Sequence, residues 1–200
     1  MRSVWLTPVV LVVAALVIVA ALYLWEKEST PQSQVGGFSV TNSGTYTNPQ
    51  YGYSISYPSG YGAKQFANVF AEVGQVNGAA FTEKADLAML SATVKDPSTS
   101  FDDFVRLSAQ LACGTSGSPP VKCGEIATSS TITTGSGVQG TELYFNSSDG
   151  VRGPFFAFNV TRNVPSASYA VLLLYPPSQY AGSNTDEALL RQIAFSVQVK

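Results

Sequence analysis

The sequence contains no histidine among its 200 residues. Histidine is the side chain that most often serves as general base or transition-metal ligand, so Ser-His-Asp and Cys-His catalytic sites are excluded. Charged residues make up 12% of the chain, about half the usual share, and the formal net charge is −2. The basic residues are scattered and form no stripe, so we expect no nucleic-acid partner.

Cysteine is nearly as scarce, with Cys113 and Cys123 as the two copies. A structural metal site would need further ligands that the chain lacks, and no Asp-rich loop offers a carboxylate cation site. We therefore expect no metal and no cofactor. Outside the cytoplasm the two cysteines would form one disulfide across a short Gly- and Pro-containing loop, and two free thiols are the alternative.

One long apolar run stands near the N-terminus. Val4 to Trp25 is 22 residues without a charge, and at about 1.5 Å per residue a helix of this length spans about 33 Å. The alternative is a cleaved signal peptide, which has a shorter apolar core and a small-x-small cleavage site. Because the run ends in the bulky residues Tyr23, Leu24 and Trp25, the sequence favours a retained transmembrane anchor.

The flanking charges predict the orientation of this anchor. Arg2 precedes the run and Lys27 follows it, and with the terminal amine the balance favours a cytoplasmic N-terminus in the plasma membrane. Residues 26–45 are rich in Ser, Thr, Gln and Gly and read as a flexible linker. Residues 46–200 then form one extracytoplasmic domain behind a single-pass anchor.

Residue periodicity predicts the first half of this domain. Tyr53, Ile55 and Tyr57 alternate with serines, which indicates a half-buried strand, and short strands follow over 66–73 and 86–95. A helix then begins after the N-cap Ser100 and ends at Gly114. Its expected apolar face consists of Phe101, Phe104, Val105, Leu107, Leu111 and Ala112.

The sequence of the second half of the domain predicts more strands and a helix near the C-terminus. Strands are expected over 125–134, 141–145, 156–160 and 169–175, and the last is apolar on both faces and so central. A helix from about Thr185, capped by Asn184 and Glu187, packs through Ala188, Leu189, Ile193 and Phe195, and a short strand ends the chain. The fold class is α+β, with a mostly antiparallel β-sheet packed between helices.

Two sequence patterns could indicate a ligand-binding or catalytic site. Residues 135–140 read G-x-G-x-x-G, but a strand follows where a dinucleotide site needs a helix. A Ser–Lys hydrolase site stays open as an alternative, although nothing singles out a pair. No catalytic residue is therefore predicted, and the chain is expected not to be an enzyme.

The segment from Tyr46 to Tyr61, YTNPQYGYSISYPSGY, resembles the opening of PsbP-like domains. Members typically read Tyr-x-Asn, then Tyr-Gly-Phe-Ser-Ile-x-Tyr-Pro-x-x-Trp; Tyr53 stands here for the usual Phe, and Tyr61 stands near the usual Trp. The resemblance implies an antiparallel sheet between helices, with bacterial membrane-anchored relatives. It implies no functional residues, because no positions match those of the photosystem subunit.

The remaining hypothesis is a non-catalytic, membrane-tethered binding or accessory module whose partner is an envelope protein or a glycan. Its expected contact surface is a tyrosine patch of Tyr46, Tyr51 and Tyr61, which lie in or beside turns. The alternative is that these tyrosines are packed under the first hairpin. A structural envelope protein is the second function class.

Overall fold

The computed structural model describes residues 44–67, 69–77, 80–81, 85–114, 122–148, 150–177 and 187–200. All of them belong to one compact unit, Gly36–Lys200. No helix within these ranges is long and apolar enough to span a membrane. The expected anchor at 4–25 and nearly all of the expected linker lie outside the described residues.

The larger of two sheets has the order β3-β4-β6-β10-β9-β8-β7, and every neighbouring pair is antiparallel. The short strand β5 pairs with β4 beside this path. The bounds are β3 Tyr61–Ala67, β4 Phe70–Asn77, β5 Ala80–Phe81, β6 Leu87–Val94, β7 Cys123–Thr133, β8 Gln139–Ser147, β9 Gly150–Asn159 and β10 Tyr169–Tyr175.

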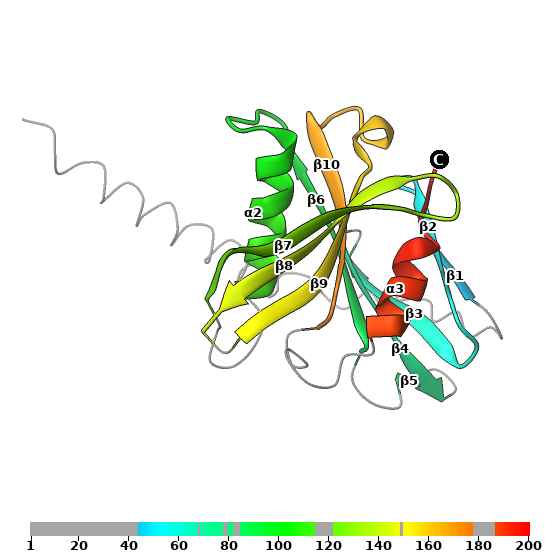
Figure 1. Ribbon diagram of the computed structural model, residues 1–200. Coiled ribbons are helices and arrows are strands. Elements are labelled where there is room, and N and C mark those ends of the chain that lie inside the picture. The colour runs from blue at the N-terminus through cyan, green and yellow to red at the C-terminus, as the bar shows by residue number, and fades with distance from the viewer. Residues whose placement is uncertain are drawn as a thin grey trace, which may run out of the picture. The chain divides into compact units, whose positions relative to one another are not determined.

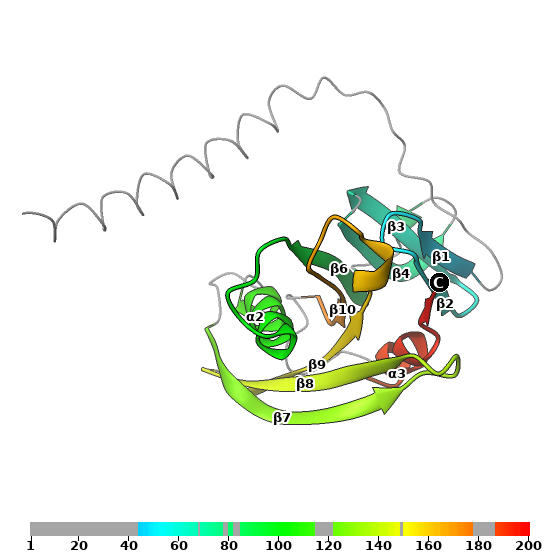
Figure 2. The ribbon, with the colours of Figure 1, turned by 90° about the horizontal axis from the view of Figure 1, so that it is seen from above.

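The smaller sheet has the order β1-β2-β11 and is also antiparallel. Its strands are β1 Gly44–Asn48, β2 Tyr53–Tyr57 and β11 Gln198–Val199. The helices are α2 Phe101–Gly114, the 3-10 turn η1 Thr161–Asn163 and α3 Glu187–Phe195. Figures 1 and 2 show α2 on one side of β6 and β10, with α3, β1 and β2 on the other side. The predicted α+β class with a mostly antiparallel sheet is confirmed.

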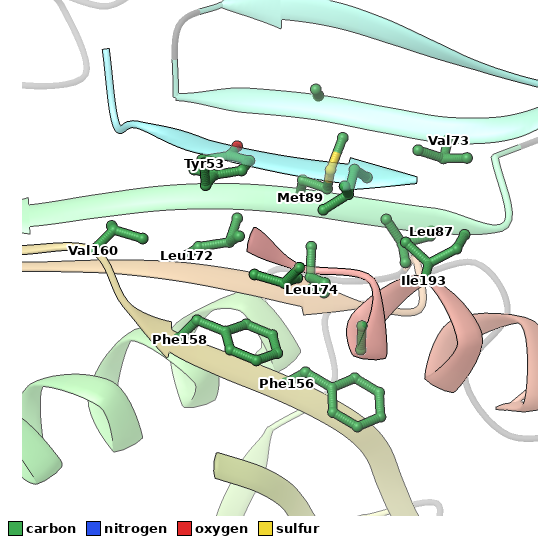
Figure 3. Close-up of a cluster of buried hydrophobic side chains, with 14 of the residues drawn as sticks. Tyr53, Val73, Leu87, Met89, Phe156, Phe158, Val160, Leu172, Leu174 and Ile193 are labelled. Carbon is green, nitrogen blue, oxygen red and sulfur yellow. The ribbon is translucent and has the colours of Figure 1, made fainter. Parts of the chain in front are cut away.

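The main core lies between the large sheet and the layer formed by α3 and the small sheet. Figure 3 shows side chains from β2, β6, β9, β10 and α3 meeting there. Strand periodicity sends alternate residues to this face, among them Met89, Leu172 and Phe158, each at most 1% exposed. Burying such a side chain stabilises the fold by about 1.5–3 kcal/mol.

A second core lies under α2, on the opposite face of the same sheet. The intervening residues of β9 and β10, such as Phe155, Val171 and Leu173, pack there with Val105 and Ala109 of the helix. The central strand β10 is therefore apolar on both faces because both faces are covered. This confirms the prediction of a central strand at 169–175.

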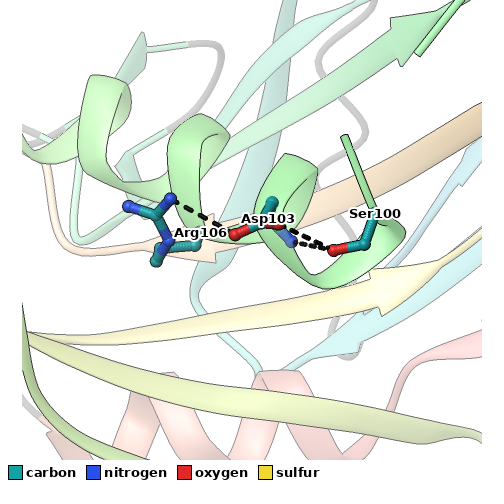
Figure 4. Close-up of polar contacts among 3 residues, drawn as sticks. All are labelled: Ser100, Asp103 and Arg106. Atoms are coloured by element: carbon teal, nitrogen blue, oxygen red, sulfur yellow. Dashed lines mark hydrogen bonds and ion pairs between the residues drawn. The ribbon is translucent and has the colours of Figure 1, made fainter. Parts of the chain in front are cut away.

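The predicted N-cap of α2 is confirmed (Figure 4). The Ser100 hydroxyl accepts a hydrogen bond from the Asp103 backbone N–H at 3.2 Å and donates one to the Asp103 carboxylate at 2.9 Å. Arg106 pairs with that carboxylate one turn further on, at 3.3 Å. Because these bonds stabilise the charged form, the pKa of Asp103 is lowered. The Ser100 hydroxyl therefore caps the helix, and the Asp103 carboxylate fixes the position of that hydroxyl.

Two local predictions were wrong, and one strand was not predicted. The single strand expected over 66–73 is the end of β3 and the start of β4, because the chain reverses between Ala67 and Phe70. The strand that was not predicted is β1, which begins at Gly44 and pairs with β2. In α3, Ala188 and Phe195 are exposed, whereas Leu189 and Ile193 are buried as expected.

Candidate functional site

The structure separates the three tyrosines of the predicted patch. Tyr51 is only 3% exposed and lies in the main core, so its predicted exposure is wrong. Tyr46 and Tyr61 are half-buried and pack against the same core. The physical reason is that β1 and β2 form a hairpin that folds onto the large sheet and takes the tyrosine rings beneath it.

Tyr53 and Tyr57 are buried, as their alternation with serine predicted. The Tyr46 and Tyr53 rings are 6.2 Å apart, and the Tyr53 hydroxyl lies 3.3 Å from the Ser91 hydroxyl. Burial raises the pKa of the Tyr53 hydroxyl well above its usual value, because the phenolate would be poorly solvated there. This tyrosine cluster therefore holds the hairpin on the sheet.

The Cys113–Cys123 disulfide is formed, which confirms the prediction, and its Cα atoms are 6.0 Å apart. It joins the end of α2 to the start of β7. Beside it, the Gln110 amide donates to the carbonyls of Cys123 and Gly124, each at 2.9 Å. This corner of the fold is fixed by one covalent bond and two hydrogen bonds.

A polar cluster lies between α3 and the strands β7, β8 and β9. Glu142 of β8 is nearly buried and forms a 2.7 Å ion pair with Arg191 of α3. The Ser130 and Tyr144 hydroxyls donate to the same carboxylate at 3.3 Å, and Tyr144 accepts a bond from Arg191 at 3.0 Å. Burial alone would lower the pKa of Arg191, but the contacts with Glu142 and its neighbours raise it.

Each charge in this cluster has partners, so the cluster attaches α3 to the sheet and leaves no group free to act on a ligand. Its members are Ser130, Glu142, Tyr144 and Arg191. Sequence reasoning missed it, because Glu142 reads as an ordinary outward residue of an alternating strand. The long β7–β8 hairpin reaches across α3 (Figure 2), and that is why this face of β8 is covered.

The lysines in the described part of the chain give no support to a Ser–Lys site. Lys95, Lys122 and Lys200 are exposed. Lys64 is half-buried, with its ammonium 4.8 Å from the centre of the Phe66 ring. A catalytic lysine needs burial beside its serine to become a base near neutral pH. Among the described residues, no three Cys, Asp or Glu side chains cluster as a metal site would require.

The glycines of the G-x-G-x-x-G motif have structural roles. Gly137 has a φ of +80° in the turn between β7 and β8. A Cβ atom at Gly140 would lie 2.6 Å from the Phe158 ring. The motif is a tight turn followed by a close contact between β8 and β9. This agrees with the prediction that a strand, and not a helix, follows the glycines.

On its α2 side, the large sheet is covered only in part by the described elements. The helix lies against β7, β8, β9 and β10. Beyond it, Phe70 of β4 and Leu90 and Ala92 of β6 project on the same face and are half-buried. We call this region, formed by β3, β4 and β6 on the α2 side, the open half-face.

The wall of the open half-face is one flank of α2. Phe104 packs on Tyr169 of β10, at 6.1 Å between ring centres, whereas Gln110 on the opposite flank bonds to β7. Leu107 lies three residues from both Phe104 and Gln110 and so points away from the sheet. Leu111 lies seven residues after Phe104, on its flank. The two leucines are 46% and 66% exposed, so their predicted place in the core is wrong. Val105, Ala109 and Ala112 face the sheet instead.

The rim of the open half-face is the β3–β4 hairpin. Phe66 is 53% exposed and Val69 is 41% exposed, and the Phe66 ring lies 5.7 Å from the Phe70 ring. A single exposed apolar residue is common on a protein surface and needs no explanation. Here the exposed Phe66 ring contacts the half-buried Phe70 ring, so the apolar surface continues from the rim onto the floor. The single strand expected over 66–73 hid this feature, since it placed no turn between Phe66 and Phe70.

No family model matches the chain, and no curated protein matches it. Among solved structures it is similar to cyanobacterial PsbP (CyanoP) from Synechocystis sp. PCC 6803, with a TM-score of 0.47 and 14% identity over 85% of this chain and 99% of that chain. It is also similar to a protein from Bacteroides thetaiotaomicron VPI-5482, with a TM-score of 0.35 and 8% identity over 80% of this chain and 49% of that chain. The first is a PsbP, the family that the segment from Tyr46 to Tyr61 resembles. At these identities the likeness concerns the fold alone.

Proposed function

We propose that this protein is a non-catalytic accessory module, tethered to the membrane, that binds an apolar helix of a partner protein on its open half-face. The observation that carries the proposal is the open half-face itself. It has a half-buried floor of Phe70, Leu90 and Ala92, and exposed apolar side chains on both sides. This face replaces the tyrosine patch as the candidate binding surface.

The dimensions of the open half-face fit one helix. Three strands at about 4.8 Å spacing give a width of about 10–14 Å, and a helix with its side chains is about 10–12 Å across. The described part of the chain already places one helix, α2, on the other half of the same face. A second helix beside it would pack against the flank of α2 that carries Phe104 and Leu111.

The chemistry of the face favours a protein over a glycan. The exposed side chains offer apolar area and belong to Phe66, Val69 and Leu111. A sugar would instead need polar groups that match its hydroxyls around an aromatic surface. Lys64 of β3 and Glu72 of β4 lie opposite each other in the sheet register and place one charge of each sign on the floor. An amphipathic helix with a mainly apolar contact stripe suits this pattern.

Membrane tethering rests on the uncharged run from Val4 to Trp25. The full-length protein should remain in the membrane pellet after carbonate extraction. Protease added outside intact cells or spheroplasts should remove the domain. Release by carbonate, or full protection of the domain, would contradict the proposed anchor or its orientation.

Site-specific photo-crosslinking tests the binding surface. A photoreactive amino acid at Leu111 of the full-length chain in its native membrane should give one discrete crosslinked protein. A matched probe at Gln192, an exposed residue of α3, should not. Peptide mapping should place the crosslinks on apolar partner residues spaced three or four apart, as on one helix face.

Other outcomes overturn the proposal. Crosslinks to lipid alone would make the open half-face a membrane-contacting surface. Equal crosslinking from Leu111 and Gln192, or none from either, would favour a structural envelope protein without a discrete partner site.

A further inference from the structure

The strand β7 forms one edge of the large sheet and is unusually accessible. It is eleven residues long, and in the described part of the chain it pairs with β8 alone. Its segment from Thr128 to Thr131 is exposed at every position. An edge strand of this kind presents unpaired backbone N–H and C=O groups to any strand that comes alongside.

The usual protections of an edge strand are missing from the second half of β7. Register shifts interrupt its pairing with β8 only before Thr128, and pairing is regular from Thr128 to Thr133. This stretch contains no proline and no charge, and Glu125 is the single charged residue of the strand. The opposite edge, β3, carries Lys64 and a register shift at Gln65–Ala67.

Both ends of β7 are fixed to the rest of the domain. The Cys113–Cys123 disulfide holds its start against α2. After its end, the Gly135 N–H donates to the Phe195 carbonyl at 3.1 Å, and the Ser136 hydroxyl donates to the Val197 carbonyl at 2.8 Å. The exposed strand is thus held in an extended conformation, which reduces the entropy lost on pairing.

We propose that β7 is a self-association edge, on which the β7 strand of a second copy of this chain pairs antiparallel to continue the large sheet. About a two-fold axis, one residue lies opposite its own copy, and residues equally far before and after it lie opposite each other. With the axis at Ser130, Ser129 meets Thr131 and Thr128 meets Ile132. No register centred on 129–131 brings two charges together.

The side chains favour a second copy over an unrelated strand. The hydroxyls of Thr128, Ser129 and Thr131 can both donate and accept a hydrogen bond. The Ser130 hydroxyl donates to Glu142 and can still accept one. A strand of hydroxyl residues is therefore complementary to itself, and Thr–Ser cross-strand pairs are stabilising. The edge is distinct from the open half-face, so this self-association and the proposed helix binding can fail independently.

Disulfide crosslinking of the full-length chain tests the proposal. Single variants Ser129→Cys, Ser130→Cys and Thr131→Cys scan the axis, and Val151→Cys is the control because Val151 is 59% exposed on the inner strand β9. A residue opposite its own copy has a Cβ–Cβ separation of about 4.5–5.5 Å, which permits a disulfide. At least one edge variant should form covalent dimer about tenfold more than the control. Yields at all three positions equal to the control would overturn the proposal.

A second set of variants distinguishes strand pairing from random collision of the introduced cysteines. Adding Ser129→Lys and Thr131→Lys to Ser130→Cys places lysines opposite each other, and like charges across a strand pair oppose association. The covalent dimer should then fall about tenfold, with an unchanged circular dichroism spectrum. Undiminished dimer in this variant would show that the cysteines meet by collision and would equally overturn the pairing.

Discussion

Replacing Arg191 by methionine tests whether the polar cluster attaches α3 to the sheet. Methionine keeps an apolar stem over the Phe156 ring, where the guanidinium carbon now lies 5.9 Å from the ring centre. The change removes the 2.7 Å ion pair to Glu142 and the 3.0 Å bond to Tyr144. It leaves a nearly buried carboxylate with two hydroxyl donors and no cation.

The magnitude follows from the exposure of the two partners. Breaking a buried ion pair costs about 3–5 kcal/mol, while an exposed pair contributes about 0–1 kcal/mol. The side chain of Glu142 is 9% exposed and that of Arg191 is 38% exposed, so solvent screens the pair in part. We expect Arg191→Met to lower the free energy of unfolding by about 2 kcal/mol.

Equilibrium urea unfolding followed by circular dichroism measures this difference. Arg106→Met is the matched control, because Arg106 pairs with Asp103 at 3.3 Å while both side chains are more than 40% exposed. The control should change stability far less. If both variants lose the same small amount, the Glu142–Arg191 pair does not attach α3, and the reasoning from burial is refuted.

Three further predictions concern the core and its covalent link. Reducing the Cys113–Cys123 disulfide should lower the free energy of unfolding by about 3 kcal/mol, as loop-closure entropy gives for a short ring, in urea unfolding with and without reductant; an unchanged midpoint would contradict this. Tyr51→Ala should lower the melting temperature far more than Tyr61→Ala, because Tyr51 is 3% exposed and Tyr61 is half-buried; the reverse order would restore Tyr51 to the surface. Burial, and then Glu72, raises the pKa of Tyr175 to about 12 from the 10 of an exposed tyrosine. The unfolded chain therefore loses this proton first, so stability should fall between about pH 10 and 12, and Tyr175→Phe should reduce that loss in alkaline unfolding curves; a variant as alkali-sensitive as the parent would contradict this assignment.

The sequence pattern predicted those parts of the fold where the pattern is compatible with only one local structure. The strand 169–175 is apolar at every position, and only a strand covered on both faces can bury it. Ser100 predicted the start of α2 because an N-cap acts on the backbone N–H groups of its own first turn. Cys113 and Cys123 had no partner but each other for a covalent link.

The candidate site could not be predicted, because it depends on which side of an apolar helix the sheet occupies. Leu107 and Leu111 fit a helical stripe as well as Val105 and Ala109 do. The smaller residues face the sheet, whereas Leu111 lies on the flank of the helix and Leu107 points away from the sheet. The turn between Phe66 and Phe70 was missed because the residues on its two sides, 66–67 and 69–71, are all apolar and read as one continuous strand.

The most direct test of the open half-face introduces a charge on its α2 wall and measures crosslinking to the partner from its β3–β4 rim. In the full-length chain, a photoreactive residue at Phe66 of β3 reports on partner contact while Leu111→Asp alters α2. Because Leu111 is 66% exposed, this change should cost only the lower helix propensity of Asp and its charge near the helix C-terminus, about 1 kcal/mol. The account predicts that the crosslink from position 66 disappears while the fold persists. An undiminished crosslink would contradict the claim that the rim, floor and wall bind one helix.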